Sequence, residues 1–410
     1  MASVNLVKDF GVVYGDDPAN ELNNNAALAA AISWLQKQSV KPKLTADEGI
    51  IRYSQSPNFF IPGLVFETNG EVRFRYGGTG NAVVIDGGTL TTAAGFKFGA
   101  GSGVIVEAPP TAKHGIYMRN VIRGGINVRC YGAGSQHAGL RLEGCVSTDV
   151  WVTVTNTEGG WYMGAQPLAG ISMDSSGGAN TQTSYVQLHN PVVNSCQVGI
   201  FFGGTLGVDV WGGDSEWNTV VGALFDETAL NNRLFGIDLE VNGPPGNRVD
   251  VSCDGQFNEF LSIDTNTRFV FTTNSASNRL IGGNHDAIDH YGDANEIADV
   301  RYNRSMGATT VNDYGKNLRR GDMFDCGTKM WDSQRTGMIS LSDSAPTYAC
   351  RTRAETLVVT NPGALTSIVV YRNGVALCNW PMDVPVRLSC GDIAAFAFTG
   401  QAPTVLSMAQ

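Results

Sequence analysis

The chain has 410 residues, a formal net charge of −10 and only 16% charged side chains. Its 50 Gly, together with frequent Asn and Thr, weigh against a helical protein and predict many short strands joined by tight turns. The acidic balance leaves no basic stripe for a nucleic-acid partner, and no segment is apolar over the length that membrane insertion requires.

The Cys content indicates neither a zinc site nor a dense disulfide framework. The eight Cys are scattered without a Cys-x-x-Cys pair, so we expect free thiols in the core rather than a zinc site or a disulfide framework. Residues 1–10 lack the apolar segment of a signal peptide, which predicts synthesis in a cytosol. Motifs for nucleotide binding and for serine hydrolases are missing, and we expect no cofactor.

One long helix is predicted, near the start of the chain. The three Asn at positions 23–25 offer capping side chains, and residues 26–38 carry Leu28, Ile32 and Leu35 at helical spacing. The rest of the chain contains strand-sized apolar runs instead.

Two short motifs precede this helix, Asp-Phe-Gly at 9–11 and Gly-Asp-Asp at 15–17. Together with the helix they resemble the opening of bacteriophage tailspikes and other pectate-lyase-superfamily proteins, in which this segment caps the N-terminal end of a β-helix. The resemblance covers residues 4–38, whereas the segment 49–63 departs from the family pattern. It implies a right-handed parallel β-helix, a homotrimer and a place in a phage virion, attached to the tail or to an adaptor protein.

Short apolar segments that begin with Gly recur from about residue 110 to 300, and most steps between them span 23 to 31 residues. This period, without intervening helices, is typical of a β-solenoid, in which each coil buries its apolar face against the next. The segments begin at Gly115, Gly139, Gly170, Gly199, Gly222 and Gly236; the last step spans only 14 residues, so Gly222 and Gly236 cannot be equivalent. Asn residues that could hydrogen-bond from coil to coil recur at turns, at Asn194, Asn218, Asn242, Asn258 and Asn278.

The predicted fold is all-β, with a short N-terminal helical cap and a C-terminal antiparallel β domain. Its parts are a cap with the first coils over 1–110, a parallel β-helix of about eight to ten coils over 111–303, a polar linker over 304–320, and a β-sandwich-like domain over 321–410. In this last domain, Asn373-Gly374 between alternating strands predicts a hairpin. The resemblance implies that this domain serves trimerisation or glycan binding.

Candidate catalytic residues follow from the chemistry of sugar cleavage, which usually needs two carboxylates flanking the scissile bond. Asp238, Glu240 and Asn242 alternate with apolar residues and are predicted to point outward from one strand. Residues two apart on a strand lie about 6.6–7 Å apart, closer to the carboxylate spacing of inverting enzymes (about 6.5–9.5 Å) than to that of retaining ones (about 5–5.5 Å). A solvated strand face is the alternative interpretation.

Asp214 and Glu216 form a second candidate pair, flanked in the sequence by Trp211 and Trp217. Exposed Trp side chains commonly stack on sugar rings, so both are predicted to bind substrate. If the two acidic strands lie one coil apart, about 4.8 Å, all four carboxylates line one groove. A purely structural β-helix turn is the alternative for this segment.

Trp161 and Tyr162 are two further candidates for substrate binding. They follow Gly159 and Gly160 in a stretch without strand alternation, which predicts a loop of the kind that often walls a groove. Packing in the core or at a trimer contact is the alternative for any one of these Trp.

A lyase is the second kind of enzyme that the sequence allows. No Lys lies between His114 and Gly315, which removes one common base for β-elimination of a uronate and leaves Arg side chains such as Arg123. His285 and His290 flank a short acidic run, which we expect to be a polar turn rather than a metal site.

Residues and resemblance together predict a phage tailspike that binds a bacterial surface polysaccharide, capsule or lipopolysaccharide, and hydrolyses it with a carboxylate pair. The alternatives are a receptor-binding spike without activity, a polysaccharide lyase and a structural virion component. An enzyme differs from a binder in having two carboxylates across a groove. A binder differs from a structural component in exposing Trp161, Trp211 and Trp217 in that groove.

Overall fold

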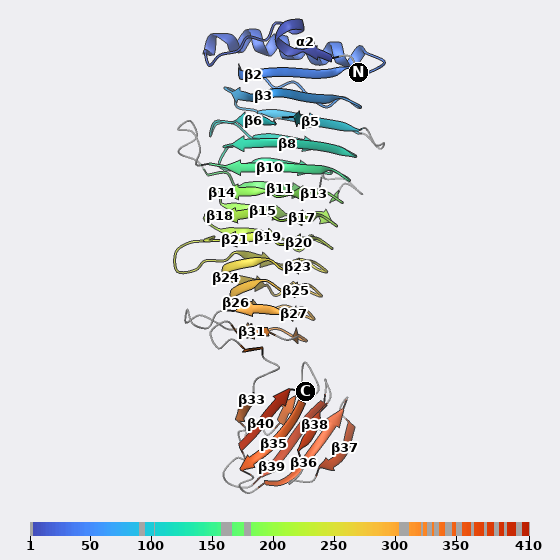
Figure 1. Cartoon of the computed structure of the whole chain (residues 1–410), viewed down its shortest axis with the longest axis vertical. Helices are drawn as coiled ribbons and strands as arrows, with labels where there is room; N and C mark the ends of the chain where they lie inside the picture. Colours follow the sequence, from blue (N-terminus) through green and yellow to red (C-terminus); the bar gives the residue numbers. More distant parts are fainter. Residues whose placement is uncertain are drawn as a thin grey trace.

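The fold is a right-handed parallel β-helix with a helical cap at its N-terminal end and an antiparallel β domain after its last coils (Figure 1). Every described pairing of its 30-stranded sheet is parallel except that of β31 with β32, which confirms the predicted solenoid. The computed structural model describes residues 3–89, 95–101, 103–156, 166–175, 182–302, 311–320, 323–325, 330–331, 336–340, 347–349, 355–361, 365–372, 375–380, 385–388, 392–398 and 404–409.

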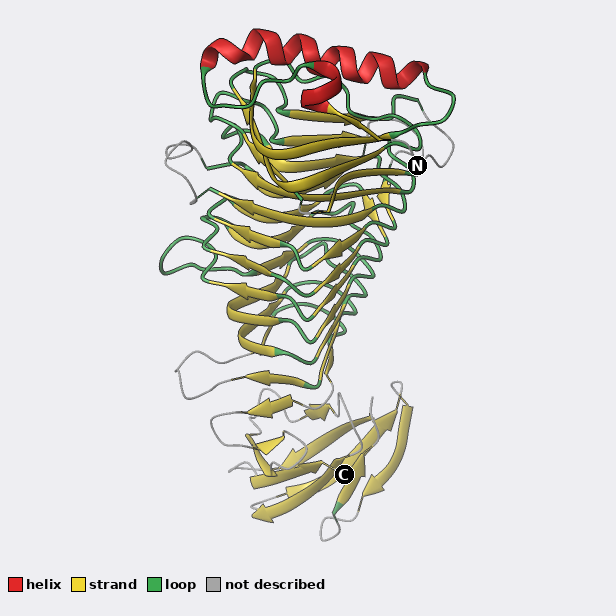
Figure 2. Cartoon of the chain, turned by 45° about the horizontal axis from the view of Figure 1, so that its top comes forward, coloured by secondary structure: helices red, strands yellow, loops and turns green. Residues whose placement is uncertain are grey.

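The main element of the cap is one long helix laid across the first coil (Figure 2). Its buried side chains, Leu28, Ile32 and Leu35 among them, continue the core of the coils. No helix in the described ranges is long and apolar enough to cross a membrane. The elements of the cap are β1 (Ser3–Asn5), α1 (Leu6–Phe10), η1 (Pro18–Asn20) and α2 (Glu21–Lys37).

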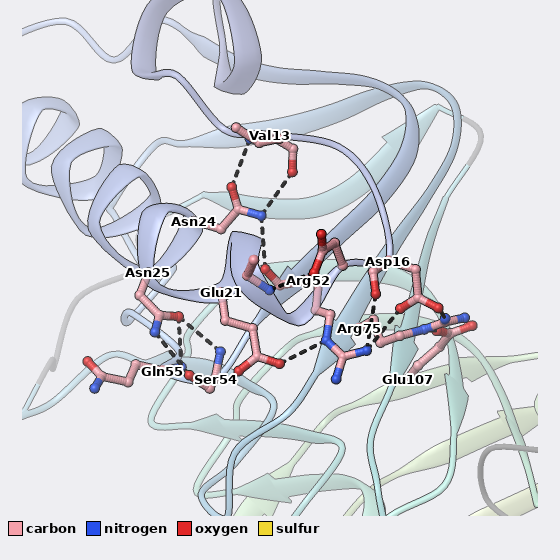
Figure 3. A network of polar contacts seen from close by, with 12 residues as sticks. Val13, Asp16, Glu21, Asn24, Asn25, Arg52, Ser54, Gln55, Arg75 and Glu107 are labelled. Carbon is pink, nitrogen blue, oxygen red and sulfur yellow. Dashed lines mark hydrogen bonds and ion pairs between the residues drawn. The ribbon is translucent and has the colours of Figure 1, made fainter.

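The long helix begins at Glu21 and not at residue 26, so the prediction that the Asn at 23–25 cap it is wrong. Asn24 lies inside the helix and is fully buried. Its Oδ1 accepts from Val13 N at 2.8 Å, and its Nδ2 donates to the carbonyls of Val13 and Arg52, both at 2.9 Å (Figure 3). These bonds to neighbouring segments outweigh the weak helix propensity of Asn.

An ion-pair network joins the cap to the first coils (Figure 3). Arg52 donates to Glu21 Oε1 at 2.8 Å and to Asp16 Oδ1 at 3.1 Å. Arg75 of the next coil pairs with Asp16 and with Glu107. Arg73 donates to Oε1 of the same Glu107 at 3.2 Å, so two guanidinium groups satisfy this almost fully buried carboxylate.

The first coils have long strands, whereas most later coils have three short strands, which divide the wall into three faces; β24 and β26 each run through two of these faces. The long strands are β2 (Lys43–Tyr53), β3 (Val65–Tyr76), β5 (Phe96–Gly101), β6 (Val104–Glu107), β8 (Gly124–Tyr131) and β10 (Asp149–Thr155). We call the first short-strand face the apolar face: β4 (Val83–Asp86), β7 (Ile116–Arg119), β9 (Ala138–Glu143), β11 (Ala169–Asp174), β15 (Val198–Phe202), β19 (Val221–Phe225), β22 (Val251–Cys253), the ends of β24 (Asp264–Phe271) and β26 (Asn284–His290), and β29 (Val311–Asp313).

The other two faces continue the two halves of β8 and β10. The aromatic face contains β13 (Gln187–His189), β17 (Asp209–Trp211), β20 (Arg233–Phe235), β23 (Glu259–Leu261), β25 (Arg279–Ile281), β27 (Glu296–Ala298) and β30 (Arg319–Arg320). The acid face contains β14 (Val192–Asn194), β18 (Asp214–Glu216), β21 (Asp238–Glu240), the starts of β24 and β26, β28 (Val300–Tyr302) and β31 (Met323–Asp325), which meets β32 (Met330–Trp331). A corner pair is β12 (Thr183–Ser184) with β16 (Thr205–Leu206).

The parallel ladder extends into the segment predicted as a linker over 304–320. There β29 and β30 pair with β26 and β27, so residues 311–313 and 319–320 belong to the coils. Polar side chains of this segment bond across the ladder, as where Asn312 Nδ2 donates to Asp289 Oδ1 at 2.8 Å. The polar residues at 311–313 and 319–320 therefore lie on strands of the ladder and not in a linker.

Buried Asn side chains link successive coils at two corners, and four of the five Asn named from the sequence take part. Asn218 Nδ2 donates to Asn242 Oδ1 at 2.8 Å, and Asn258 Nδ2 donates to Asn278 Oδ1 at 3.1 Å. Asn194 lies instead at the end of β14, where its Oδ1 accepts from Thr155. Cys130, Cys145, Cys196 and Cys253 are buried free thiols.

The C-terminal domain has two four-stranded antiparallel sheets around its own core, which includes Ile368 and Phe396. β36 pairs with β37 and sets Arg372 opposite Val375, which confirms the predicted hairpin; the Asn-Gly turn lies outside the described residues. The sheets are β33 (Thr336–Ser340), β40 (Thr404–Ala409), β35 (Glu355–Asn361) and β38 (Val386–Leu388), and β34 (Thr347–Ala349), β39 (Asp392–Phe398), β36 (Leu365–Arg372) and β37 (Val375–Trp380).

Candidate functional site

Five carboxylates form an array on the acid face. β18 and β21 pair in a register that sets Asp214 beside Asp238 and Glu216 beside Glu240. Asp264, at the start of β24, lies beside Asp238 on the next coil, so Asp214, Asp238 and Asp264 form a column along the coils. Both acidic pairs named from the sequence thus lie on adjacent coils, with backbones about 4.8 Å apart between coils and about 6.6–7 Å apart along a strand.

The outward direction of these side chains follows from the burial of the residues between them. Ser215 and Leu239 are fully buried, whereas the flanking carboxylates are half-buried. The alternation stops after Glu240, because Val241 adopts the left-handed conformation with φ 56°. Asn242, predicted to point outward, is therefore buried and donates to Asp250 Oδ1 at 2.9 Å.

No Arg or Lys in the described ranges forms an ion pair with any of the five carboxylates. Burial, followed by the charges of Glu216 and Asp238, raises the pKa of Asp214 to about 6. Burial, followed by the charge of Asp264, raises the pKa of Asp238. The charge of Asp238, ahead of burial, raises the pKa of Glu240. The array therefore holds one carboxyl group, that of Asp214, that is partly protonated near neutral pH and lies beside other carboxylates.

Trp211 and Trp217 lie at the two edges of the acid face, on opposite corners. Trp211 ends β17 on the aromatic face, where its ring stacks on Phe235 at 4.0 Å and its Nε1 donates to Gln187 at 2.7 Å. Trp217 follows Glu216, has φ 56° and is 60% exposed. Trp161 and Tyr162, the other predicted substrate-binding residues, lie outside the described residues.

The aromatic face carries a hollow that the sequence analysis did not predict. Trp151 is 44% exposed and its ring stacks on His189 at 4.5 Å. Beside it lies a hollow of about 600 Å³ that Lys97, Arg123 and Asp149 help to line. In the sequence, Trp151 alternates with Val residues, which indicates that its ring points outward. The sequence does not give the register between coils, which brings Lys97, Arg123 and Asp149 close to this ring.

The segment from His285 to His290 forms strand β26, so the prediction of a polar turn is wrong. Gly282 and Gly283 make the turn before it, with φ 71° and 82°. His285 points inward, where its Nδ1 lies 2.9 Å from Thr265 Oγ1 and burial lowers its pKa to about 4. Within the described ranges, no three His, Cys, Asp or Glu side chains are grouped so that they could hold a metal ion.

The sequence matches no family profile and no curated protein. Several solved structures have a similar fold. The Dettilon tailspike protein is 10% identical with a TM-score of 0.48, over 99% of this chain and 93% of that one. The adhesin PfbA of Streptococcus pneumoniae is 9% identical with a TM-score of 0.40 (84% and 97%), and an Acinetobacter phage tailspike protein is 11% identical with a TM-score of 0.37 (99% and 86%). At these identities the similarity concerns the fold.

Proposed function

We propose that this protein is a phage tailspike that binds a bacterial surface polysaccharide and hydrolyses it on the acid face. The observation that carries the proposal is the array of carboxylates, which form no ion pair with an Arg or Lys among the described residues and in which the pKa of Asp214 is about 6. Clustered carboxylates that repel one another lower the stability of a fold, so an array of this kind favours a role in catalysis over a structural one. The family resemblance of residues 4–38 supports the same function.

In this proposal Asp214 is the general acid and Glu240 the general base. Among the five carboxyl groups of the array, Asp214 has the largest upward shift of its pKa, so it can protonate a leaving glycosidic oxygen. Glu240 lies diagonally from it, one coil and two residues away, at about 8 Å between backbones. That separation leaves room for a water molecule and predicts inversion at the anomeric carbon.

The test is incubation of the protein with capsular polysaccharides and lipopolysaccharides, with measurement of new reducing ends. Asp214→Asn and Glu240→Gln should each lower the cleavage rate by about a hundredfold or more, whereas Glu296→Gln on the aromatic face should not. Activity should fall as the pH rises above about 6, because Asp214 then loses the proton that it donates. Cleavage that both variants retain contradicts the assignment, and absorbance of unsaturated uronates identifies a lyase.

A receptor-binding spike without hydrolysis is the second candidate, and the exposed stacks on the aromatic face favour it. Trp151 on His189 and Trp211 on Phe235 offer flat rings to sugars without any catalytic group. Binding of a polysaccharide without new reducing ends is the result that identifies this function.

We also propose that the protein is a homotrimer in the virion tail, joined to the tail or to an adaptor protein. Its support is a pair of partly exposed apolar side chains on the apolar face, Phe201 and Leu224, which pack against the buried Ala169, Val198 and Val221. Apolar side chains on an outer face are commonly covered by another subunit. Light scattering that gives a monomer mass contradicts the trimer.

A further inference from the structure

One outward position in the lining of the hollow on the aromatic face has no side chain. Gly125 stands in the outward column that continues as Asp149, Gln187, Asp209 and Arg233 on later coils. Every later member of this series fills its place on the wall with a long or charged side chain. The missing side chain leaves the floor of the hollow open.

The fold does not require glycine at this position. A Cβ added to Gly125 would meet Asp149 O at 3.8 Å and Lys97 Cγ at 3.9 Å, which is ordinary van der Waals contact, and its φ is not left-handed. The adjacent Gly124 differs, because its Cβ would lie 2.6 Å from Val121. A strand position can hold glycine although neither steric contacts nor the backbone conformation require it. Such a glycine is typical of a place that a ligand approaches closely.

Two cationic side chains line the hollow. Lys97 lies directly beside Gly125 in the ladder, and Arg123 stands at the corner two residues before it. Both side chains are exposed, and neither forms an ion pair with a residue in the described ranges. The one carboxylate of the lining, Asp149, has His189 Nε2 at 3.3 Å. The free charge of the hollow is therefore positive on a protein of formal charge −10.

An aromatic platform begins at the edge of the hollow. Trp151 lines it and stacks on His189 with ring planes 17° apart. The ladder continues this column through Trp211 to Phe235, which are themselves stacked. Rings in a column along the coils suit an extended chain of sugars, because each ring can stack on one apolar sugar face.

We propose that the hollow binds an acidic sugar of a glycan, with its carboxylate at Lys97 and Arg123 and the next sugar on the ring of Trp151. Carboxylate recognition by a guanidinium and an ammonium group uses charge-assisted hydrogen bonds, which are the strongest kind available at a protein surface. The inference rests on the proposed glycan binding but not on the proposed hydrolysis, since it uses none of the five carboxylates of the acid face.

The test measures binding to immobilised capsular polysaccharides, acidic and neutral, in the full chain and its variants. Gly125→Leu fills the floor of the hollow without removing a charge, and the double variant Lys97→Ala/Arg123→Ala removes both cations. Each should weaken binding of an acidic polysaccharide by about tenfold or more, as should Trp151→Ala. Circular dichroism checks that each variant is folded.

Two controls separate the hollow from general effects. Lys316→Ala removes an exposed charge and Phe257→Ala an exposed ring, both far along the ladder from Gly125, and both should leave binding unchanged. Raising the salt concentration from about 50 to about 500 mM should weaken binding of acidic but not of neutral polysaccharides.

The outcomes distinguish this inference from the proposed function. Binding of acidic polysaccharides that Gly125→Leu and the double variant leave intact overturns the inference. Binding of neutral polysaccharides alone overturns it too, while the proposed function stands. Binding of no polysaccharide overturns both.

Discussion

Replacing Asp214 by Asn should stabilise the protein at pH 8 while it lowers the rate of the proposed cleavage. The pKa of this carboxyl group is raised from 3.8 to about 6 by burial and by Glu216 and Asp238. The folded chain therefore binds the proton more tightly than the unfolded chain does. Its free energy of unfolding falls as the pH rises from about 4 to about 6, and the loss is complete above that range.

The magnitude follows from the shift and from exposure. A shift of this size corresponds to about 3 kcal/mol at about 1.4 kcal/mol per pH unit. Because Asp214 is only half-buried, solvent screens the repulsion, and about 1 kcal/mol is the expected net effect. Asn cannot ionise, so Asp214→Asn should be more stable than the native chain by about 1 kcal/mol at pH 8 and equally stable near pH 4.

Guanidinium unfolding followed by circular dichroism at the two pH values measures this difference. Asp209→Asn is the matched control on the same coil, because Asp209 accepts two hydrogen bonds from Arg233, at 2.6 and 2.8 Å. It should lower the free energy of unfolding at pH 8. A stabilisation by Asp214→Asn that is equal at both pH values, or a destabilisation at pH 8, refutes the reasoning.

Two further predictions concern the stability of the coils. Asn258→Ala should lower the free energy of guanidinium unfolding by about 4 kcal/mol, because four buried hydrogen bonds of its side chain are lost at about 1 kcal/mol each. The control Asn274→Ala, at an exposed position, should change this free energy by less than about 0.5 kcal/mol. Equal losses in the two variants would contradict a stabilising role of the buried Asn hydrogen bonds. Gly283→Ala should abolish soluble expression, since its Cβ would lie 1.8 Å from Ile263 O. Gly246 is also left-handed, but a Cβ there would meet nothing within 4 Å. Gly246→Ala should therefore lower the free energy of unfolding by about 1 kcal/mol and leave the yield of soluble protein unchanged.

The coil repeat could be predicted because its signal is local. A Gly followed by alternating apolar residues marks the second position of a short strand, and Gly170 and Gly199 are in register between β11 and β15. Gly236 departs from this register, as its short step from Gly222 predicted, and forms the corner between β20 and β21. The helical cap was predicted for the same reason, since Leu28 and its periodic neighbours are close in the sequence.

The composition of the site could not be predicted in full, because it depends on corners and on loop lengths. One left-handed residue, Val241, inverts the alternation and buries Asn242, and a strand pattern carries no mark of such a residue. Asp264 joins the array only because the chain between β21 and β24 is long enough to complete one coil. Lys97 and Arg123, similarly, come together through the register of adjacent coils.

The charges of the acid face and of the hollow act independently of each other. Four ladder steps separate the coil of Lys97 from that of Asp214, which is about 19 Å at about 4.8 Å per step. The screening length in physiological salt is about 8 Å, so the carboxylate array does not repel an anion held in the hollow. An acidic sugar directly over Asp214 and Glu240 would, by contrast, meet unscreened like charges. A glycan that used both surfaces would therefore need acidic sugars spaced by neutral ones, so that a neutral unit reaches the acid face while a carboxylate stays at Lys97 and Arg123.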